Sequence, residues 1–258
     1  MSAKVPDKKI AVVIIAYNAA KTIEAAWREI PKEWVDLIII GDDCSQDNTA
    51  ELARRLPGAL VIRHEKNQHM GGNQMILYDK ALEMGFDIVV LLHGDNQFDP
   101  GKVPEMVRAL TEGGADAVLG SRIAGHQTRE GGMPRYKEIS NKVLAFVQNR
   151  AYRLNLSDYA TGYKAYSRKV LETIPYRRNR RDFLFDEQVN TQIVKFGFRL
   201  TQVPIPTRYF PEATTVNFWT SLHYGFFTLW TVCQYLLHNW GLKKFTYLEP
   251  RDEKRAGG

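Results

Sequence analysis

The sequence predicts an α/β fold in which a mainly parallel β-sheet is flanked by helices. Two patterns indicate it: short apolar runs rich in β-branched residues recur between Ile10 and Gly120, and amphipathic helical patterns separate most of these runs. Repeated βαβ units of this kind bury a parallel sheet under helices on both faces. The 258 residues, 44% of them apolar and 25% charged, are enough for one large α/β domain.

The first five predicted strands are the apolar runs at residues 10–16, 36–40, 60–63, 87–92 and 116–120. The helical patterns between them include residues 21–30, 48–56 and 72–85. In such sheets, ligands bind beyond the carboxyl ends of the strands. The polar residues that follow each run are therefore the candidate site.

After residue 120 the alternation stops. Residues 125–135 are a Gly-rich, charged stretch that is too long for a simple connection, and we predict that it is a substrate lid. The elements predicted beyond it are a helix from residue 136 to about 154, a helix around residues 186–195 and a strand at residues 198–205.

Residues 218–240 predict a long amphipathic helix. One stripe of this helix, at steps of three and four, carries large apolar side chains and one cysteine: Trp219, Leu222, Phe226, Leu229, Cys233, Leu236 and Trp240. The segment is too polar for a membrane span, which needs about 20 largely apolar residues. Its tryptophans and the Lys-Lys pair that follows favour a helix in the membrane interface, and packing on the core or on a partner is the alternative. We therefore predict a domain at 1–215 and a separate helix and polar tail at 216–258.

Composition narrows the classes of partner and compartment. The net charge of +6 favours anionic partners, but no zinc finger, basic zipper or RNA-binding motif is present, so nucleic acid is not an expected partner. Cys44 and Cys233 match no metal spacing and predict no disulfide framework, which suits a reducing cytoplasm. The amino-terminal residues contain no apolar stretch typical of a signal peptide.

Two polar segments at strand ends are the candidate ligand sites. The stretch "LLHGDNQFDP" at residues 91–100 ends a buried-looking strand in a carboxylate, Asp95. The stretch "GDDCSQDNT" at residues 41–49 follows the second strand, and there Asp43 is the ligand candidate while Asp47 is a candidate helix N-cap. The first turn, "AYNAAKT", lacks the G-x-G-x-x-G of dinucleotide-binding proteins, so NAD and FAD are not expected.

The segments "VVIIAYNAAKTI", "IIIGDDCSQDNT", "HGDNQFDP" and "AVLGSR" resemble, in order and spacing, the family 2 glycosyltransferases, which have the GT-A fold. The later "MPRYKEISNK", "SDYATGYKAYSRKVL" and "FLFDEQV" are most similar to the dolichyl- and polyprenyl-phosphate mannose or glucose synthase group. The resemblance covers roughly residues 8–215. It implies that a sugar moves from GDP-mannose or a UDP-sugar to a polyprenyl phosphate, with inversion at C1. Together with the amphipathic helix and the absence of a predicted disulfide framework, this acceptor favours a cytoplasmic enzyme that is peripherally associated with the membrane through residues 216–242.

The same resemblance implies roles for individual residues. Asp95 corresponds to the last acid of the D-x-D motif, which holds Mg²⁺ or Mn²⁺, and His93 replaces the usual first acid. A hard cation often takes only one or two protein carboxylates together with phosphate oxygens. The implied contacts with the nucleotide sugar are Ala16, Tyr17, Asp43, Asn73 and Gln97. The implied contacts with the acceptor phosphate are Arg122, Arg135 and Lys164, and Arg122 also counts as catalytic.

The role of Asp186 separates two possible acceptors. A hydroxyl acceptor needs a general base to remove its proton, and Asp186, or its neighbour Glu187, is then the candidate. A lipid phosphate is already ionised near neutral pH and needs no base. The basic excess and the amphipathic tail favour the lipid. A catalytically silent nucleotide-binding adaptor is the remaining alternative, because His93 stands where the family has an acid.

Overall fold

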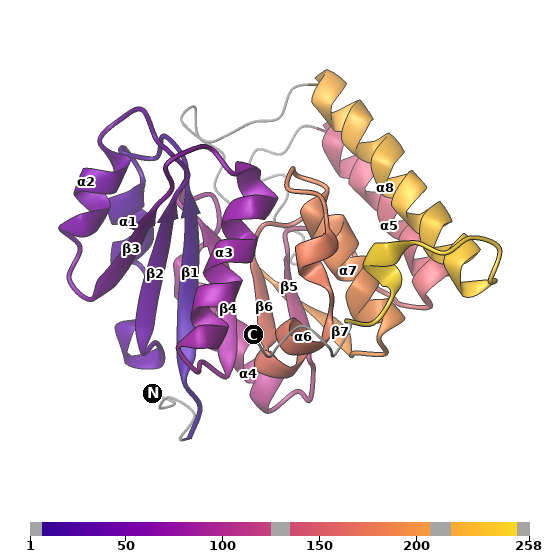
Figure 1. Cartoon of the computed structure of the whole chain (residues 1–258), viewed down its shortest axis with the longest axis horizontal. Coiled ribbons are helices and arrows are strands. Elements are labelled where there is room, and N and C mark those ends of the chain that lie inside the picture. Colours follow the sequence, from indigo (N-terminus) through magenta and orange to yellow (C-terminus); the bar gives the residue numbers. More distant parts are fainter. Residues whose placement is uncertain (1–6, 125–134, 207–217, 252–258) are drawn as a thin grey trace.

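The computed structural model describes residues 7–124, 135–206 and 218–251, which form a seven-stranded sheet with helices on both faces (Figure 1). The strands are β1 Ile10–Ala16, β2 Leu37–Asp42, β3 Ala59–Arg63, β4 Ile88–His93, β5 Ala117–Ser121, β6 Lys164–Ser167 and β7 Leu200–Pro204. Their order across the sheet is β3-β2-β1-β4-β6-β5-β7. Only β6 runs antiparallel to its neighbours, β4 and β5, so the predicted mainly parallel sheet is confirmed.

The α-helices are α1 Ile23–Arg28, α2 Thr49–Arg54, α3 His69–Glu83, α4 Val103–Thr111, α5 Arg135–Tyr152, α6 Arg168–Thr173, α7 Phe185–Lys195 and α8 Phe218–Asn239. The 3-10 turns are η1 Lys32–Trp34, η2 Pro100–Lys102, η3 Tyr176–Arg178 and η4 Thr246–Leu248. The six predicted strands correspond to β1–β5 and β7. The sequence did not predict β6 as a strand, because it is only four residues long and includes a lysine.

Successive residues of β1 enter two different cores, because side chains alternate across a strand. Val13 packs in a core with Leu77 of α3 and Val189 of α7. Val12 packs on the opposite face in a core with Ile23 of α1 and Val107 of α4. Burial on both faces explains why the strands read as unbroken apolar runs.

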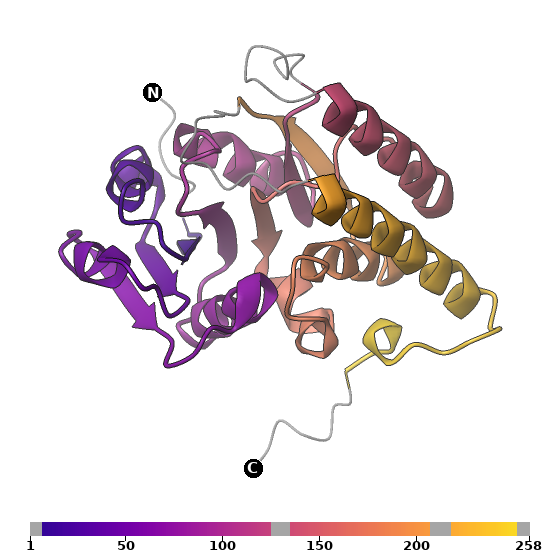
Figure 2. The ribbon, with the colours of Figure 1, turned by 90° about the horizontal axis from the view of Figure 1, so that it is seen from above.

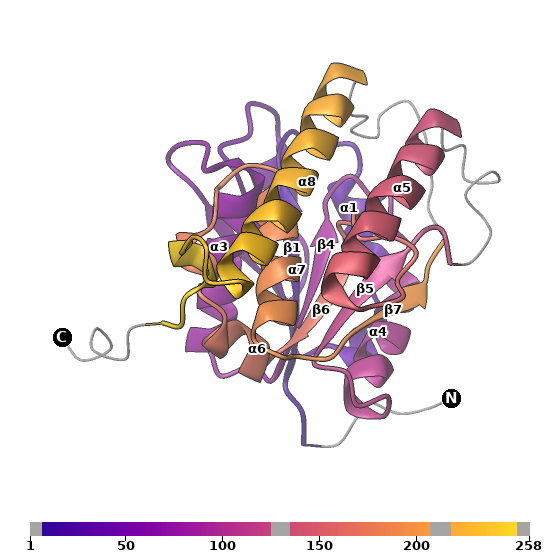
Figure 3. The same ribbon diagram turned by 90° about the vertical axis from the view of Figure 1, so that its right-hand side faces the viewer.

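Helices α5 and α8 lie together at the end of the molecule away from β3, and they form an outer layer over α7 (Figures 2 and 3). The bounds of α8 confirm the predicted helix to within one residue. Part of its apolar stripe, however, faces outward: Leu222 is 57% exposed and Phe226 is 65% exposed. Polar Thr228 and Thr231 are buried on the inner side. Helix α8 therefore packs on the domain while Leu222, Phe226 and Leu229 of its stripe stay exposed, and Leu236 of the same stripe packs against the core.

Several predictions concern residues beyond the described ranges. The predicted lid at 125–135 lies almost entirely in the undescribed residues 125–134, and the domain boundary at 215 falls in the undescribed residues 207–217. Both remain predictions. Within the described ranges, no helix combines the length and the apolar character that crossing a bilayer requires.

Candidate functional site

Three of the predicted site residues lie at one edge of the sheet, because the strands that precede them end in register. In β1, Ala16 pairs with Asp42 of β2, and the next amide along, that of Asp43, donates to the carbonyl of Ala16 at 2.9 Å. Ile15 pairs with His93 of β4. Tyr17 follows β1 and Asp43 follows β2, so the two residues lie side by side. Asp95 follows β4, the other neighbour of β1. The side chain of Tyr17 is half exposed there.

The loops that follow β1 and β2 are joined by side-chain hydrogen bonds. The amide of Asn18 donates to Ser45 Oγ at 2.9 Å, and the amide of Ala19 donates to Thr49 Oγ1 at 2.7 Å. Without glycines to form a phosphate-binding turn, the first loop satisfies its amides with hydroxyl groups of the second. Much of the polar turn at 43–49 therefore holds the first loop in place.

Asp47 was the predicted N-cap of α2, but it lies one residue before the N-cap position and bonds to the start of the helix from there. The N-cap residue of α2 is Asn48, whose side chain makes no capping bond. Asp47 instead accepts from the amide of Thr49 at 3.0 Å and from the amide of Ala20 at 3.1 Å. Asp47 thus ties the start of α2 to the first loop.

Asp43 is 4% exposed, and its Oδ1 accepts from the amide of Gln68 at 2.7 Å. Burial raises the pKa of the Asp43 carboxyl above its usual value, and the Gln68 amide and two nearby histidines act against that rise. The side-chain oxygen of Gln68 accepts from Nη1 of Arg181 at 2.7 Å. Arg181 ends a basic run, residues 177–181, that is visible in the sequence, but its link to Asp43 through Gln68 was not predicted.

Asn73 and Ala16 lie under this edge and are buried. The Nδ2 of Asn73 donates to the carbonyl of Gly41 at 2.8 Å, and its Oδ1 lies 3.0 Å from Nε2 of His64. Asn73 was predicted to contact the nucleotide sugar. Both polar groups of its side chain have hydrogen-bond partners inside the protein. Ala16 presents its backbone to Asp43 as described above.

The loop that carries Asp95 is closely packed against the end of β1. Gly94 leaves little room for a side chain, since a Cβ there would lie 3.2 Å from Cβ of Ala16 and 3.3 Å from the carbonyl oxygen of Ile15. The Oδ1 of Asp95 accepts from the amide of Gln97 at 3.1 Å, which fixes the carboxylate in an Asx turn. The glycine and the polar residues after β4 therefore hold a partly exposed carboxylate at the edge.

His93 points into the protein. Its ring packs edge-on against Phe98, with the centroids 5.9 Å apart. A Cβ on Gly162 would lie 2.5 Å from Nε2 of His93, so the loop before β6 depends on glycine at this point. Within the described residues, this buried Nε2 makes no hydrogen bond. The histidine in place of the usual acid therefore acts as a packed ring between β4 and β6.

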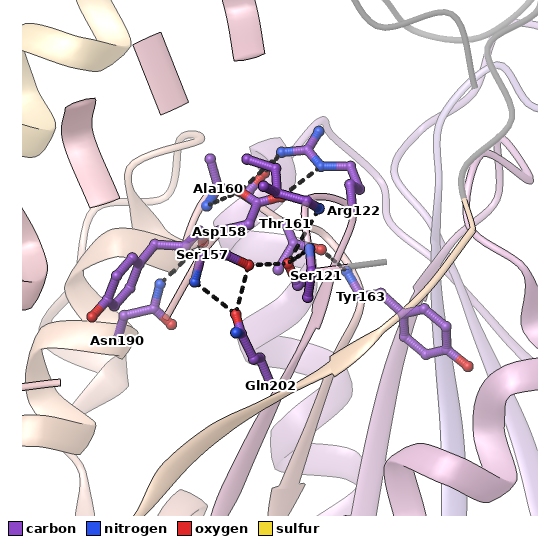
Figure 4. Close-up of polar contacts among 12 residues, drawn as sticks. Ser121, Arg122, Ser157, Asp158, Ala160, Thr161, Tyr163, Asn190 and Gln202 are labelled. Carbon is purple, nitrogen blue, oxygen red and sulfur yellow. Dashed lines mark hydrogen bonds and ion pairs between the residues drawn. The ribbon is translucent and has the colours of Figure 1, made fainter. Parts of the chain in front are cut away.

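Arg122 follows β5 and forms a two-point ion pair with Asp158, which is fully buried (Figure 4). Its Nε lies 2.8 Å from Oδ2 and its Nη2 lies 3.2 Å from Oδ1, and Nη2 also donates to the carbonyl of Ala160. The guanidinium group of Arg122, which was predicted to bind phosphate, thus binds the loop before β6. The two residues are 36 apart in sequence, so this pairing was invisible to pattern analysis.

The same loop is anchored to β5 and β7 beneath Arg122. Ser121 and Ser157 share a hydrogen bond of 2.8 Å, and the amide of Ser157 donates to Oε1 of Gln202 at 2.8 Å (Figure 4). The loop that binds Arg122 is therefore held in place by hydrogen bonds to two strands. Arg135 was also predicted to contact the acceptor phosphate. It is the first residue of α5, and its side chain is not described by the structure.

Lys164 and Asp186 form a buried ion pair, with Nζ 2.7 Å from Oδ1. Lys164 begins β6 opposite Leu91 of β4, so the antiparallel strand brings it within two positions of His93. Asp186 lies in the first turn of α7 and is 8% exposed. The structure thus brings together two residues that the sequence assigned to different roles, the acceptor phosphate and the base.

The residues at the edge fit a hard divalent cation bound with a phosphate ligand. Asp95 offers a partly exposed carboxylate held by a backbone amide. The described part of the chain contains no cluster of three or more His, Cys, Asp or Glu side chains that could hold a metal ion. Mg²⁺ keeps waters and takes substrate phosphates around one or two carboxylates, and Asp95 is sufficient for that arrangement.

Residues 11–175 match the family described as glycosyl transferase family 2. The chain belongs to this family. The glycosyltransferase is 26% identical to a UDP-N-acetylglucosamine–dolichyl-phosphate N-acetylglucosaminyltransferase of Methanococcus voltae, over 79% of this chain and 87% of that protein. It is 25% identical to a polyprenol monophosphomannose synthase of Mycolicibacterium smegmatis, over 78% of this chain and 77% of that protein.

The glycosyltransferase also resembles a solved structure of glucosyl-3-phosphoglycerate synthase from Mycobacterium tuberculosis in complex with UDP. The TM-score is 0.69 at 21% identity, over 92% of this chain and 82% of that one. A structure of the same enzyme with Mn²⁺, UDP and glucosyl-3-phosphoglycerate has a TM-score of 0.63 at 21% identity, over 92% and 82% of the two chains. These likenesses confirm the predicted GT-A fold, and the family match confirms the predicted enzyme class.

Proposed function

We propose that this glycosyltransferase moves a sugar from a nucleoside-diphosphate donor, GDP-mannose or a UDP-sugar, to a polyprenyl phosphate with inversion at C1. The observation that supports it most is the arrangement of Tyr17, Asp43 and Asp95 at one edge of the sheet. In an α/β sheet this edge is where ligands bind. The relatives named above add the class of acceptor, since both are named for lipid phosphates.

The donor would lie along this edge. We assign the base and ribose to exposed Tyr17 and to the carboxylate of Asp43, whose loop is braced by Gln68. Gln97, two residues after Asp95, would contact the diphosphate sugar. Asn73 and Ala16 would act from beneath, Asn73 by holding the end of β2 and Ala16 through its backbone.

Asp95 is the residue that we expect to hold Mg²⁺ or Mn²⁺. When bound, the cation supplies positive charge to the departing nucleoside diphosphate. The chain's own contribution is to orient the carboxylate through the Gln97 amide, so that no side-chain reorganisation is needed during the reaction.

The acceptor phosphate would approach from the side of β5 and β6. We propose that Arg122 and Arg135 face it from the loop after β5 and from the start of α5. The ion pair of Arg122 with Asp158 would hold the loop at 157–161 in position for the acceptor. Lys164 would contribute its charge from beneath the surface, because its side chain is fully buried. An ionised phosphate oxygen then attacks C1 opposite the leaving diphosphate, with no base required.

The ion pair of Asp186 favours this lipid route over transfer to a hydroxyl. A general base must lie within hydrogen-bond reach of the proton that it accepts, but the Oδ1 of Asp186 is directed at Nζ of Lys164, 2.7 Å away. Transfer to a saccharide or protein hydroxyl with Asp186 as base is thus the second candidate, and a silent adaptor is the third.

A surface of exposed apolar residues on α5 and α8 supports the predicted contact with a membrane through residues 216–242. This outer apolar surface consists of Ile139, Val143, Phe146, Leu222, Phe226, Leu229 and Trp230, which are all exposed. Helices α5 and α8 pack against each other, and exposed apolar patches mark sites of interaction. A polyprenyl phosphate is carried by a bilayer. We propose that the enzyme lies on the cytoplasmic side of the membrane, with this surface in the lipid interface.

The variant Asp95→Asn tests the donor site. Asparagine keeps the Oδ1 acceptor for the Gln97 amide but removes the charge, so the fold should persist. We expect transfer of labelled sugar to polyprenyl phosphate to fall by about a hundredfold or more, since metal contacts contribute several kcal/mol to such reactions. Stabilisation by the donor together with Mn²⁺ should also disappear. Full transfer by the variant, or full activity of the wild type in excess chelator, would refute the metal assignment.

A further inference from the structure

Glu187 is a buried carboxylate at which three helices meet. It lies in the first turn of α7 and is 1% exposed. Its Oε2 accepts from Nε2 of Gln148 in α5 at 2.7 Å. Its Oε1 accepts from the hydroxyl of Tyr224 in α8. The carboxyl-terminal helix therefore contributes a hydrogen bond to the interior of the domain, although the sequence predicted it to be a separate segment.

Glu187 directly follows Asp186 in the first turn of α7, and Asp186 forms the ion pair with Lys164 at 2.7 Å. Burial raises the pKa of the Glu187 carboxyl, while the Tyr224 hydroxyl, the Lys164 charge and the Gln148 amide act against the rise. Asp186 adds to the rise through its like charge. The tyrosine is thus one of three groups that favour the ionised form of Glu187.

Loss of the hydroxyl group of Tyr224 would change the electrostatic surroundings of the Lys164–Asp186 ion pair. A buried carboxylate that loses a hydrogen-bond donor takes up a proton more readily. Once Glu187 is neutral, Asp186 is the remaining carboxylate beside Lys164, and the ion pair tightens. A hydroxyl group from α8 thus contacts the carboxylate that lies next to the Lys164–Asp186 ion pair in the chain.

We propose that Tyr224 is a positioning residue for sugar transfer: through Glu187, helix α8 holds the Lys164–Asp186 pair in its working arrangement. The inference rests on the proposed function, which assigns Lys164 and Asp186 to the reaction. The proposal makes α8 part of the catalytic unit. The inner side of this helix contacts Glu187, and its outer side carries the apolar surface.

The variant Tyr224→Phe tests this role, since it removes the hydroxyl and keeps the ring. We expect kcat to fall about tenfold at neutral pH while KM for the donor stays within about twofold. The acidic limb of the kcat profile should move to higher pH, because the pKa of Glu187 rises without its donor. The charged and titratable groups that face Glu187 are Lys164, Asp186, Tyr152, Tyr159 and Tyr224 itself. The tyrosines are neutral over this pH range, since burial raises their pKa values.

Tyr247→Phe is the matched control. The hydroxyl of Tyr247 donates to Oε1 of Gln234, another residue of α8, at 3.0 Å. This variant loosens the same helix without touching Glu187, so its pH profile should match that of the wild type. Gln148→Met removes the other donor to Glu187 and should shift the acidic limb in the same direction as Tyr224→Phe.

A double-mutant cycle completes the test. In a Glu187→Gln background, Tyr224→Phe should cause no further loss of kcat, because the carboxylate through which it acts is gone. Equal effects of Tyr224→Phe and Tyr247→Phe, an unshifted acidic limb, or a full effect of Tyr224→Phe in the Glu187→Gln background would each overturn the positioning role. A wild-type protein that transfers no sugar from any donor would instead overturn the proposed function itself.

Discussion

Lys164 and Asp186 carry opposite charges in a part of the domain from which water is almost excluded, since the two side chains are 0% and 11% exposed. Taking two charges out of water costs several kcal/mol each, and close pairing offsets that cost. Arg122 and the fully buried Asp158 repeat the arrangement on β5. The polar residues at the site are thus fixed by partners that lie far away in sequence.

Substitution of Asp186 alone should weaken the fold as well as any chemistry. Asp186→Asn leaves the Lys164 charge buried without its partner, and we expect a loss of about 3–5 kcal/mol in the free energy of unfolding by urea. The double variant Lys164→Met with Asp186→Leu should recover most of that loss, because apolar pairs of similar volume replace buried ion pairs at little cost. A double variant that loses at least as much free energy of unfolding as Asp186→Asn would contradict this account. Loss of activity in Asp186→Asn alone does not identify a general base.

Helix α8 exposes part of its apolar stripe. Leu222, Phe226 and Leu229 face away from the domain, while Tyr224 and Gln234 make hydrogen bonds to Glu187 and Tyr247. The period of the sequence predicted the bounds of the helix but not the direction of its stripe. Both faces of this helix carry large side chains, so periodicity alone could not say which face meets the domain.

The outer apolar surface predicts binding to lipid. Phe146→Ser combined with Phe226→Ser should lower the partitioning of the protein onto anionic vesicles by about tenfold or more, since each buried phenylalanine contributes about 1.5–3 kcal/mol. Sedimentation with vesicles measures the effect. Met84→Ser is the control, because Met84 is 40% exposed and follows α3, outside this surface. Equal losses in the control would contradict the assignment, and a wild-type dimer without lipid would indicate a second copy as the occupant.

At the scale of the whole molecule, the chain returns to its own domain after α8. Nη1 of Arg178 donates to the carbonyls of Thr246, Glu249 and Pro250, and Arg251 donates to the carbonyls of Leu171 and Ile174. Part of the basic run 177–181 therefore binds the chain's own backbone. The remaining positive charge of the molecule suits anionic substrates.

Ligand binding to the whole domain should identify the nucleotide. With Mn²⁺ present, the cognate diphosphate, GDP or UDP, at a hundred times its Kd should stabilise the fold by about 2.7 kcal/mol. For a domain of this size, that corresponds to a rise in Tm of roughly 5 °C or more. Thermal unfolding with each nucleotide, with and without a chelator, measures the difference. A Tm that neither diphosphate changes would contradict the donor site.

The sequence by itself determined strands β1–β5 and β7, the long helix α8 and the edge at which the site lies. Burial on both faces makes each parallel strand an unbroken apolar run, and the polar residues that end such runs, Asp43 and Asp95, must then emerge at the same edge. Only the tertiary structure decided the partners of the charged residues. Antiparallel β6 places Lys164 beside β4, and α8 brings Tyr224 to Glu187, 37 residues away in sequence. Local periodicity depends on which side chains share a face, whereas the pairing of charges depends on which faces meet.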